Sequence, residues 1–315
     1  MSQSSSKKSG PLVRQKEIPP TGKENESVVH WGVLKRPFIF TVGFTALSFS
    51  GAAIWQYENM RKVASQKMAH RRSQAEEIFK TWSLNVPKVG WIRQELNKYW
   101  NQLSEGDKVF VPILALNVLV FVLWRVPSLQ PLMYKYFLAT PQINKGLPML
   151  LSAFSHISLI HLGCNMFVLH SFSDHIIHAL GKEQFMGLYL SSCVITSFFS
   201  HVSKIATGRM GSSLGASGAI CTVLGVFGTL LPEAQMQIIL LPFFTFSASV
   251  GIKSLMAIDT VGILARWQFF DHAAHLSGVV FGIWWCYQGH SIIWHSTARE
   301  HLMSWWHSIR EKPPP

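Results

Sequence analysis

The chain has 315 residues, of which 48% are hydrophobic and 14% charged, and it carries 12 Trp and 21 Phe. Soluble globular domains contain about 25% charged residues, so this composition excludes an ordinary soluble domain and favours a membrane protein. The formal net charge is +12 at pH 7. In so apolar a chain, that excess indicates contact with an anionic membrane surface, and no nucleic-acid partner is expected.

Seven apolar stretches have roughly the length that crosses a hydrocarbon core about 30 Å thick. In chain order they are 38–55, 109–125, 158–177, 185–202, 216–231, 235–250 and 272–288. The fifth would be only about 24 Å long as a helix, so we expect one of its ends to stop inside the bilayer. The sequence therefore predicts an all-α polytopic membrane protein.

The polar segments between these stretches suggest five regions. Residues 1–37 are basic and rich in Ser, Lys and Pro, which predicts a disordered tail. A first helix at 38–55 is followed by a mixed-charge, amphipathic linker at 56–108, a core of six apolar stretches at 109–288 and a C-terminal tail at 289–315. Within the linker, residues 91–100 have helical amphipathic spacing. That helix either lies on the membrane surface or docks its aromatic face on the membrane domain.

A serine and a histidine stand at the heads of two apolar stretches. Ser217 lies in Gly-Ala-Ser-Gly at 215–218, and His275 lies in Asp-His-Ala-Ala-His-Leu-Ser-Gly at 271–278. One stretch separates them, so their helices run parallel and both side chains enter the bilayer from one face. An ionisable residue inside a membrane segment indicates a functional site, and a hydroxyl next to an imidazole is the minimal activated nucleophile.

A third polar pair begins the stretch at 158–177. His161 and Asn165 are four residues apart and therefore share one helix face, and their helix runs parallel to the other two. Hydrolysis of a carbonyl compound needs donors for an oxyanion. We expect these donors to be the Asn165 amide, the His161 ring and the backbone N–H of Ser217. Gly215 would allow close approach of the backbone.

Each of these features alone has a structural explanation. Gly-Ala-Ser-Gly is typical of a small-residue packing face, as is the pair Gly278 and Gly282, while His161 and Asn165 could form interhelical hydrogen bonds. Asp271, His272 and His275 could suggest a metal, although a further ligand is not evident, and no cofactor is expected. The four cysteines lack the spacing of a zinc site or a disulfide framework; Cys221 is a weaker candidate nucleophile.

Together the three motifs resemble the rhomboid family of intramembrane serine proteases. That family has His-x-x-x-Asn, Gly-x-Ser-Gly and Ala-His-x-Gly-Gly on alternate helices of a six-helix core, which match residues 161–165, 215–218 and 274–278. Further residues at 40–45, 53–58, 123–130 and 270–276 are similar to its mitochondrial branch. That similarity implies one extra N-terminal helix (1+6), a multi-pass location in the mitochondrial inner membrane, an N-terminus facing the matrix, and cleavage of single-span transmembrane proteins.

The resemblance also implies the roles of individual residues. Ser217 would be the nucleophile and His275 the base, while Asn165 and His161 would hold the oxyanion, with Gly215 in support. Partners would be transmembrane protein substrates and the lipid bilayer, and a homo-oligomer is left open.

Two departures from the family pattern bear on the base. Cys221 stands where many members have an aromatic residue on which the histidine stacks, and Ser277 replaces a glycine. Asp259 could orient His275, although the resemblance implies a Ser–His dyad. An inactive rhomboid-like protein that binds membrane clients is the main alternative, ahead of a transporter or channel.

Overall fold

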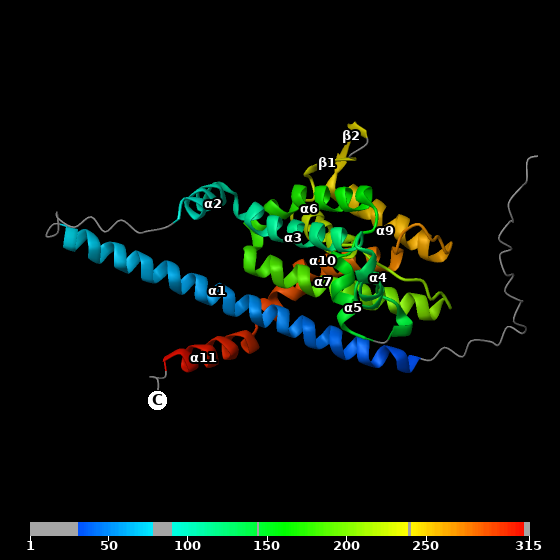
Figure 1. The fold of residues 1–315 in the computed structure, drawn as a ribbon, viewed down its shortest axis with the longest axis horizontal. Helices are drawn as coiled ribbons and strands as arrows, with labels where there is room; N and C mark the ends of the chain where they lie inside the picture. Colours follow the sequence, from blue (N-terminus) through cyan, green and yellow to red (C-terminus); the bar gives the residue numbers. More distant parts are fainter. Residues whose placement is uncertain (1–30, 78–89, 144, 239–240, 312–315) are drawn as a thin grey trace, which may run out of the picture.

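The computed structural model describes residues 31–77, 90–143, 145–238 and 241–311, so most of the predicted N-terminal tail lies outside the described residues. Within them the chain is mainly helical (Figure 1). The α-helices are α1 (Lys35–Glu77), α2 (Trp91–Gln102), α3 (Glu105–Leu123), α4 (Gln130–Tyr136), α5 (Leu147–Leu151), α6 (Leu159–Leu180), α7 (Lys182–Ala206), α8 (Ser217–Leu230), α9 (Ala248–Leu264), α10 (His272–Trp284) and α11 (Thr297–Glu311). A π-helix (Trp285–Trp294), two strands, β1 (Gln235–Ile238) and β2 (Leu241–Ser247), and short 3₁₀ turns complete the fold.

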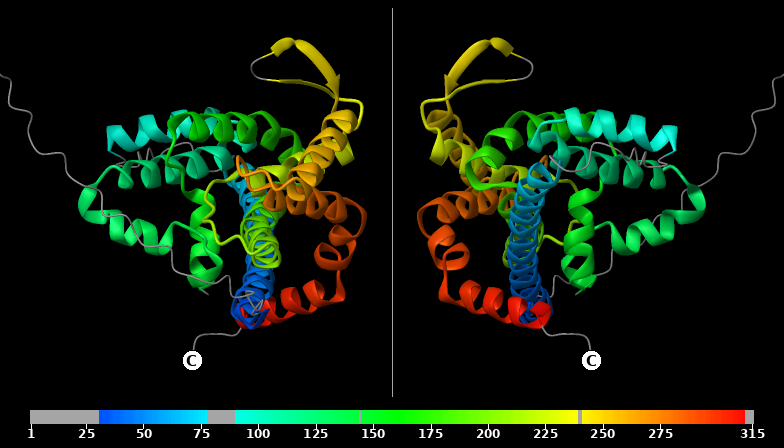
Figure 2. Two further views of the ribbon diagram at one scale, coloured as in Figure 1. Left: turned by 90° about the vertical axis from the view of Figure 1, so that its right-hand side faces the viewer. Right: turned by 90° about the vertical axis from the view of Figure 1, so that its left-hand side faces the viewer.

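Six of the seven predicted stretches are confirmed as helical, namely those in α1, α3, α6, α7, α8 and α10. The prediction of a membrane helix at 235–250 is wrong. It forms an antiparallel hairpin of β1 and β2 that projects from the helices (Figure 2). Pro242 disfavours a helix interior, and Phe243, Thr245 and Phe246 are strand formers. The helix is α9 instead, whose apolar run is interrupted by Lys253 and Asp259.

The first helix is longer than the predicted stretch at 38–55. α1 is 43 residues long and continues through Glu77 into the predicted linker, which gives a rod of about 65 Å. Figure 1 shows it running past the other helices. Polar contacts join its middle to α11: Arg299 donates to Gln56 at 2.6 Å, Tyr57 meets His307 at 2.7 Å, and Trp306 donates to Glu58 at 2.9 Å.

The predicted helix at 91–100 is confirmed as α2, but its alternative docked position is not. Leu96 is 64% and Tyr99 66% exposed, so these two side chains are not buried against the described part of the chain. A position on the membrane surface stays a prediction.

Among the described residues, three helices are long and apolar enough to cross a membrane: Trp31–Ala69, Glu105–Leu123 and Lys182–Ala206. The pair Leu147–Phe154 and Leu159–Leu180, bent by 90°, would make a fourth, and α8 is a shorter apolar helix. An all-α membrane protein fits these lengths. The arrangement of one helix plus a six-helix core stays a prediction.

Glycines bring the backbones of α8 and α10 into contact. A Cβ added to Gly278 would lie 2.3 Å from the Gly218 carbonyl oxygen, and one added to Gly282 would lie 2.3 Å from the Thr222 carbonyl oxygen. Only glycine permits this approach, so the predicted packing face is confirmed. The contact fixes the helix of the predicted nucleophile against the helix of the predicted base.

Candidate active site

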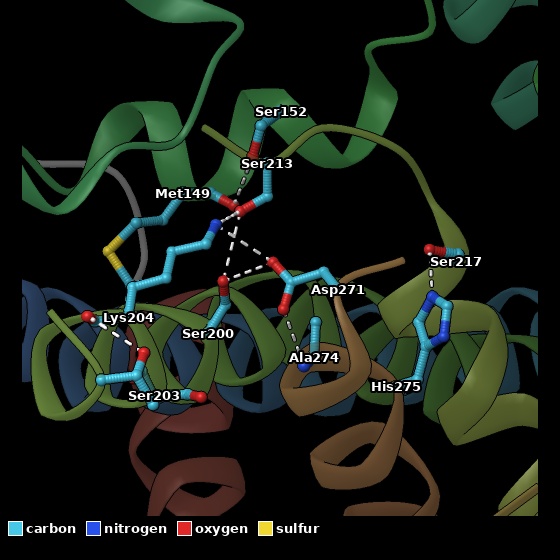
Figure 3. Close-up of polar contacts among 11 residues, drawn as sticks. Met149, Ser152, Ser200, Ser203, Lys204, Ser213, Ser217, Asp271, Ala274 and His275 are labelled. Atoms are coloured by element: carbon cyan, nitrogen blue, oxygen red, sulfur yellow. Dashed lines mark hydrogen bonds and ion pairs between the residues drawn. The ribbon is translucent and has the colours of Figure 1, made fainter. Parts of the chain in front are cut away.

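The structure brings Ser217 and His275 together from α8 and α10. His275 Nε2 lies 2.8 Å from Ser217 Oγ (Figure 3). Ser217 is the first residue of α8, so its backbone N–H has no acceptor within the helix. His275 lies in the first turn of α10, which is capped by the Asp271 side chain accepting from the Ala274 N–H at 3.2 Å.

Gly215 lies in the loop before α8 and packs against the first turns of α6. Its φ is +118°, a conformation that favours glycine, and its N–H donates to the Ser152 carbonyl at 2.8 Å. A Cβ here would lie 2.8 Å from His161 Cε1 and 3.7 Å from Asn165 Nδ2. The structure therefore places both predicted oxyanion donors beside the backbone that leads into Ser217.

His156 is a member of this group that the sequence analysis missed. It is fully buried, and its Nε2 lies 2.8 Å from Asn165 Nδ2 and 3.4 Å from the backbone N–H of Ala216. Two donors converge on Nε2, so this nitrogen accepts and the ring proton is on Nδ1. The only signal in the sequence was a histidine within an apolar run five residues before His161.

A cavity of about 550 Å³ opens beside Ser217 and His275. Hydroxyl and charged side chains make one part of its wall and aromatic rings another, so it can take up both water and apolar side chains. Its lining includes His161, Lys204, Arg209, Trp267, Phe270 and Asp271.

A polar cluster of four side chains lies next to the cavity (Figure 3). Lys204 Nζ lies 3.2 Å from Asp271 Oδ2, Ser200 Oγ donates to the same oxygen at 2.5 Å, and Lys204 also donates to Ser213. Burial alone would raise the pKa of Asp271, but the Lys204 ammonium and the hydroxyl hydrogen bonds lower it below its usual value. The cluster ties α7 to the loop before α8 and to the start of α10.

A second carboxylate lies on the other side of the predicted base. Asp259 on α9 is 1% exposed; its Oδ1 lies 2.7 Å from His272 Nδ1 and 3.6 Å from His275 Nδ1. The first distance is a hydrogen bond and the second is longer than one. Cys221 is buried, and the Phe270 ring centroid lies 6.0 Å from that of the His275 ring.

Comparison with known proteins places these residues in a family. Residues 144–291 match the model of the rhomboid domain, a range that contains all five predicted site residues. The chain is 50% identical over 285 residues to the human mitochondrial presenilin-associated rhomboid-like protein, with 89% of this chain and 73% of the relative covered. It is 43% identical over 295 residues to the zebrafish (Danio rerio) mitochondrial presenilin-associated rhomboid-like protein A, covering 89% and 76%.

A more distant relative is the mitochondrial rhomboid protein 1 of Saccharomyces cerevisiae, which is 36% identical over 176 residues, covering 54% of this chain and 50% of the relative. These relatives are mitochondrial, and the described chain has several apolar helices, so this is a mitochondrial membrane protein. With half of its residues identical over most of its length, the chain belongs to the rhomboid family.

Proposed function

We propose that the protein is an intramembrane serine endopeptidase that cleaves single-span transmembrane proteins in the mitochondrial inner membrane. The observation that carries this proposal is the 2.8 Å contact between Ser217 Oγ and His275 Nε2 at the start of a short apolar helix. A hydroxyl at this distance from an imidazole can be activated as a nucleophile.

In the first step Ser217 Oγ attacks the scissile carbonyl carbon and His275 Nε2 takes the hydroxyl proton. The attack forms a C–O bond and moves the carbonyl π electrons to oxygen. For Nε2 to accept, the neutral ring of His275 must carry its proton on Nδ1. Collapse of the intermediate then breaks the C–N bond, and His275 gives its proton to the leaving amine.

The oxyanion of the tetrahedral intermediate needs preorganised donors. The free backbone N–H of Ser217 lies at the positive end of α8, and Asn165 and His161 lie beside Gly215, two residues earlier. Because His156 Nε2 accepts from one side of the Asn165 amide at 2.8 Å, it fixes the direction of this donor. We assign Asn165, His161 and the Ser217 N–H to oxyanion binding, with Gly215 in support.

Water then hydrolyses the acyl-enzyme. His275 takes a proton from the water as its oxygen attacks the acyl carbon, the bond to Ser217 Oγ breaks, and His275 returns a proton to Ser217. The cavity beside the dyad has a polar wall through which water can reach an otherwise apolar bundle. Its aromatic wall suits side chains of an unwound substrate helix. A helical substrate must unwind to expose a peptide bond, because a helix hydrogen-bonds its own carbonyls.

The test is cleavage of a single-span reporter in proteoliposomes, together with labelling of Ser217 by a fluorophosphonate. We expect wild type to cleave and label, Ser217→Ala to do neither, and His275→Ala to lose at least roughly 1,000-fold in cleavage rate. The matched control is Ser171→Ala, since this partly exposed serine on α6 donates its hydroxyl to the Phe167 carbonyl of its own helix at 2.8 Å, and it should behave as wild type.

Cleavage that survives Ser217→Ala would overturn this mechanism. Stable binding of reporters by a folded wild type that neither cleaves nor labels would instead support an inactive, client-binding protein. Thermal unfolding of each variant in detergent shows whether a loss of cleavage comes from a loss of folding.

A further inference from the structure

Among the described residues, the Asp259 carboxylate is buried without a lysine or arginine in contact. It is 1% exposed, and its polar contacts within that part of the chain are with the imidazoles of His272 and His275. Its Oδ2 has no hydrogen-bond partner among the described residues. Burying a carboxylate costs several kcal/mol unless it is compensated, so its place behind the predicted base calls for an explanation beyond packing.

His272 holds this carboxylate in place. Its Nδ1 lies 2.7 Å from Asp259 Oδ1, and the ring is confined, since a Cβ added to Gly262 of α9 would lie 2.5 Å from His272 Cδ2. Because the ring rests on the α9 backbone, it cannot swing away from Asp259. His272 and His275 are three residues apart and lie on one face of α10.

Asp259 is therefore aimed at the far nitrogen of the base. His275 uses Nε2 to meet Ser217 at 2.8 Å, and its Nδ1 lies 3.6 Å from Asp259 Oδ1. That gap must close by about 0.7 Å to make a hydrogen bond, and catalytic hydrogen bonds often tighten only when substrate is bound. The attraction grows when the ring becomes an imidazolium, since opposite charges interact strongly away from water.

We propose that His272 and Asp259 form a positioning pair for His275: His272 fixes the carboxylate, and the carboxylate orients the base and stabilises its protonated form. This inference rests on the proposed function. The pair does not touch the reacting atoms and transfers no proton.

Other titratable groups face the same region. His161 comes from α6, Lys204 from α7 and Cys221 from α8, and Asp271 precedes α10. Lys204 and Asp271 form an ion pair with each other, so their charges largely cancel at His275. Asp259 is thus the carboxylate whose charge is directed at the ring.

The test is the pH dependence of cleavage in proteoliposomes by wild type and Asp259→Asn. We expect kcat to fall roughly 10–100-fold, a part of what positioned acid–base catalysis supplies, while KM stays within about twofold. Asp259→Asn removes a negative charge that faces the ring, so the acidic limb of the kcat profile should move to lower pH. A purely structural role would lower the amount of active enzyme and leave that limb in place.

His272→Asn gives an independent measurement. It should lower kcat less than Asp259→Asn, and the double variant should be no worse than Asp259→Asn alone, because both changes act through one contact. The matched control is Asp174→Asn, which alters another Asp–His pair on α6, Asp174 with His178 at 3.5 Å, and should leave kcat unchanged.

The wild-type measurement separates the two proposals. If wild type neither cleaves nor labels with a fluorophosphonate, the proposed function fails. If wild type is active and a folded Asp259→Asn keeps its kcat and its acidic limb, the positioning pair is wrong while the protease stands. Should Asp259→Asn not fold, unchanged kcat in His272→Asn would overturn the pair equally.

Discussion

Two carboxylates flank the predicted base, Asp259 fully buried and Asp271 partly exposed, and they differ in what neutralises them. Asp271 faces the Lys204 ammonium at 3.2 Å and a serine hydroxyl, whereas Asp259 faces two imidazoles. An ammonium keeps its charge throughout a reaction cycle, but an imidazole gains one only when it takes up a proton. The first arrangement suits a permanent joint between elements, and the second suits a group that responds to the proton on its neighbour.

The largest expected effect comes from removing the Lys204 ammonium, which neutralises Asp271. Lys204→Met leaves the partly buried Asp271 without its cation, so we expect a loss of about 2 kcal/mol in the free energy of unfolding, between the values for exposed and fully buried pairs. Denaturant unfolding in detergent micelles measures it. Lys182→Met is the matched control, since Lys182 pairs with Glu105 at a partly exposed site and should cost less than about 1 kcal/mol. Equal losses in the two variants would contradict the role assigned to the Lys204 pair.

A double variant sharpens the same point. Lys204→Met combined with Asp271→Asn removes the unpaired charge, so it should recover at least about 1 kcal/mol relative to Lys204→Met alone. The double-mutant cycle gives this coupling energy directly. Strictly additive losses would show that the two side chains do not act as a pair.

The smallest effect expected concerns the hydroxyl at the same carboxylate. Ser200→Ala removes one hydrogen bond to Asp271, which also keeps its contact with Lys204, and should cost about 1 kcal/mol of stability. Cleavage rate per folded molecule should be unchanged, in contrast to Asp259→Asn. A fall in kcat with unchanged stability would show that the cluster acts on the chemistry as well.

The sequence predicted the two residues that meet at the centre of the site because motif and spacing depend on local chain geometry. Ser217 heads a short apolar helix and His275 heads another, and glycine contacts align them as expected. His156 escaped prediction because it is placed by loop packing, and its part appears only when Asn165 and Ala216 converge on its ring. The sequence suggested Asp259 as a residue that could orient His275, but its hydrogen bond with His272 depends on how α9 packs on α10.

The errors in the predicted fold also have local causes. Hydropathy placed a membrane helix at 235–250, where strand formers and Pro242 give a hairpin. It missed α9, whose Lys253 and Asp259 lower its apparent apolarity. It also ended the first helix too early, because the polar residues after 55 continue the same helix outside the apolar stretch.

The polar contacts between α1 and α11 also bear on where the bilayer ends. A helix that enters the hydrocarbon at Lys35 travels about 30 Å, the thickness of that layer, in roughly 20 residues. It therefore reaches the opposite boundary close to Gln56 and Glu58, which accept hydrogen bonds from Arg299 and Trp306 of α11. These contacts hold α11 close to that boundary, and beyond them residues 60–69 of α1 are exposed, as expected for a helix that continues past the hydrocarbon layer into water.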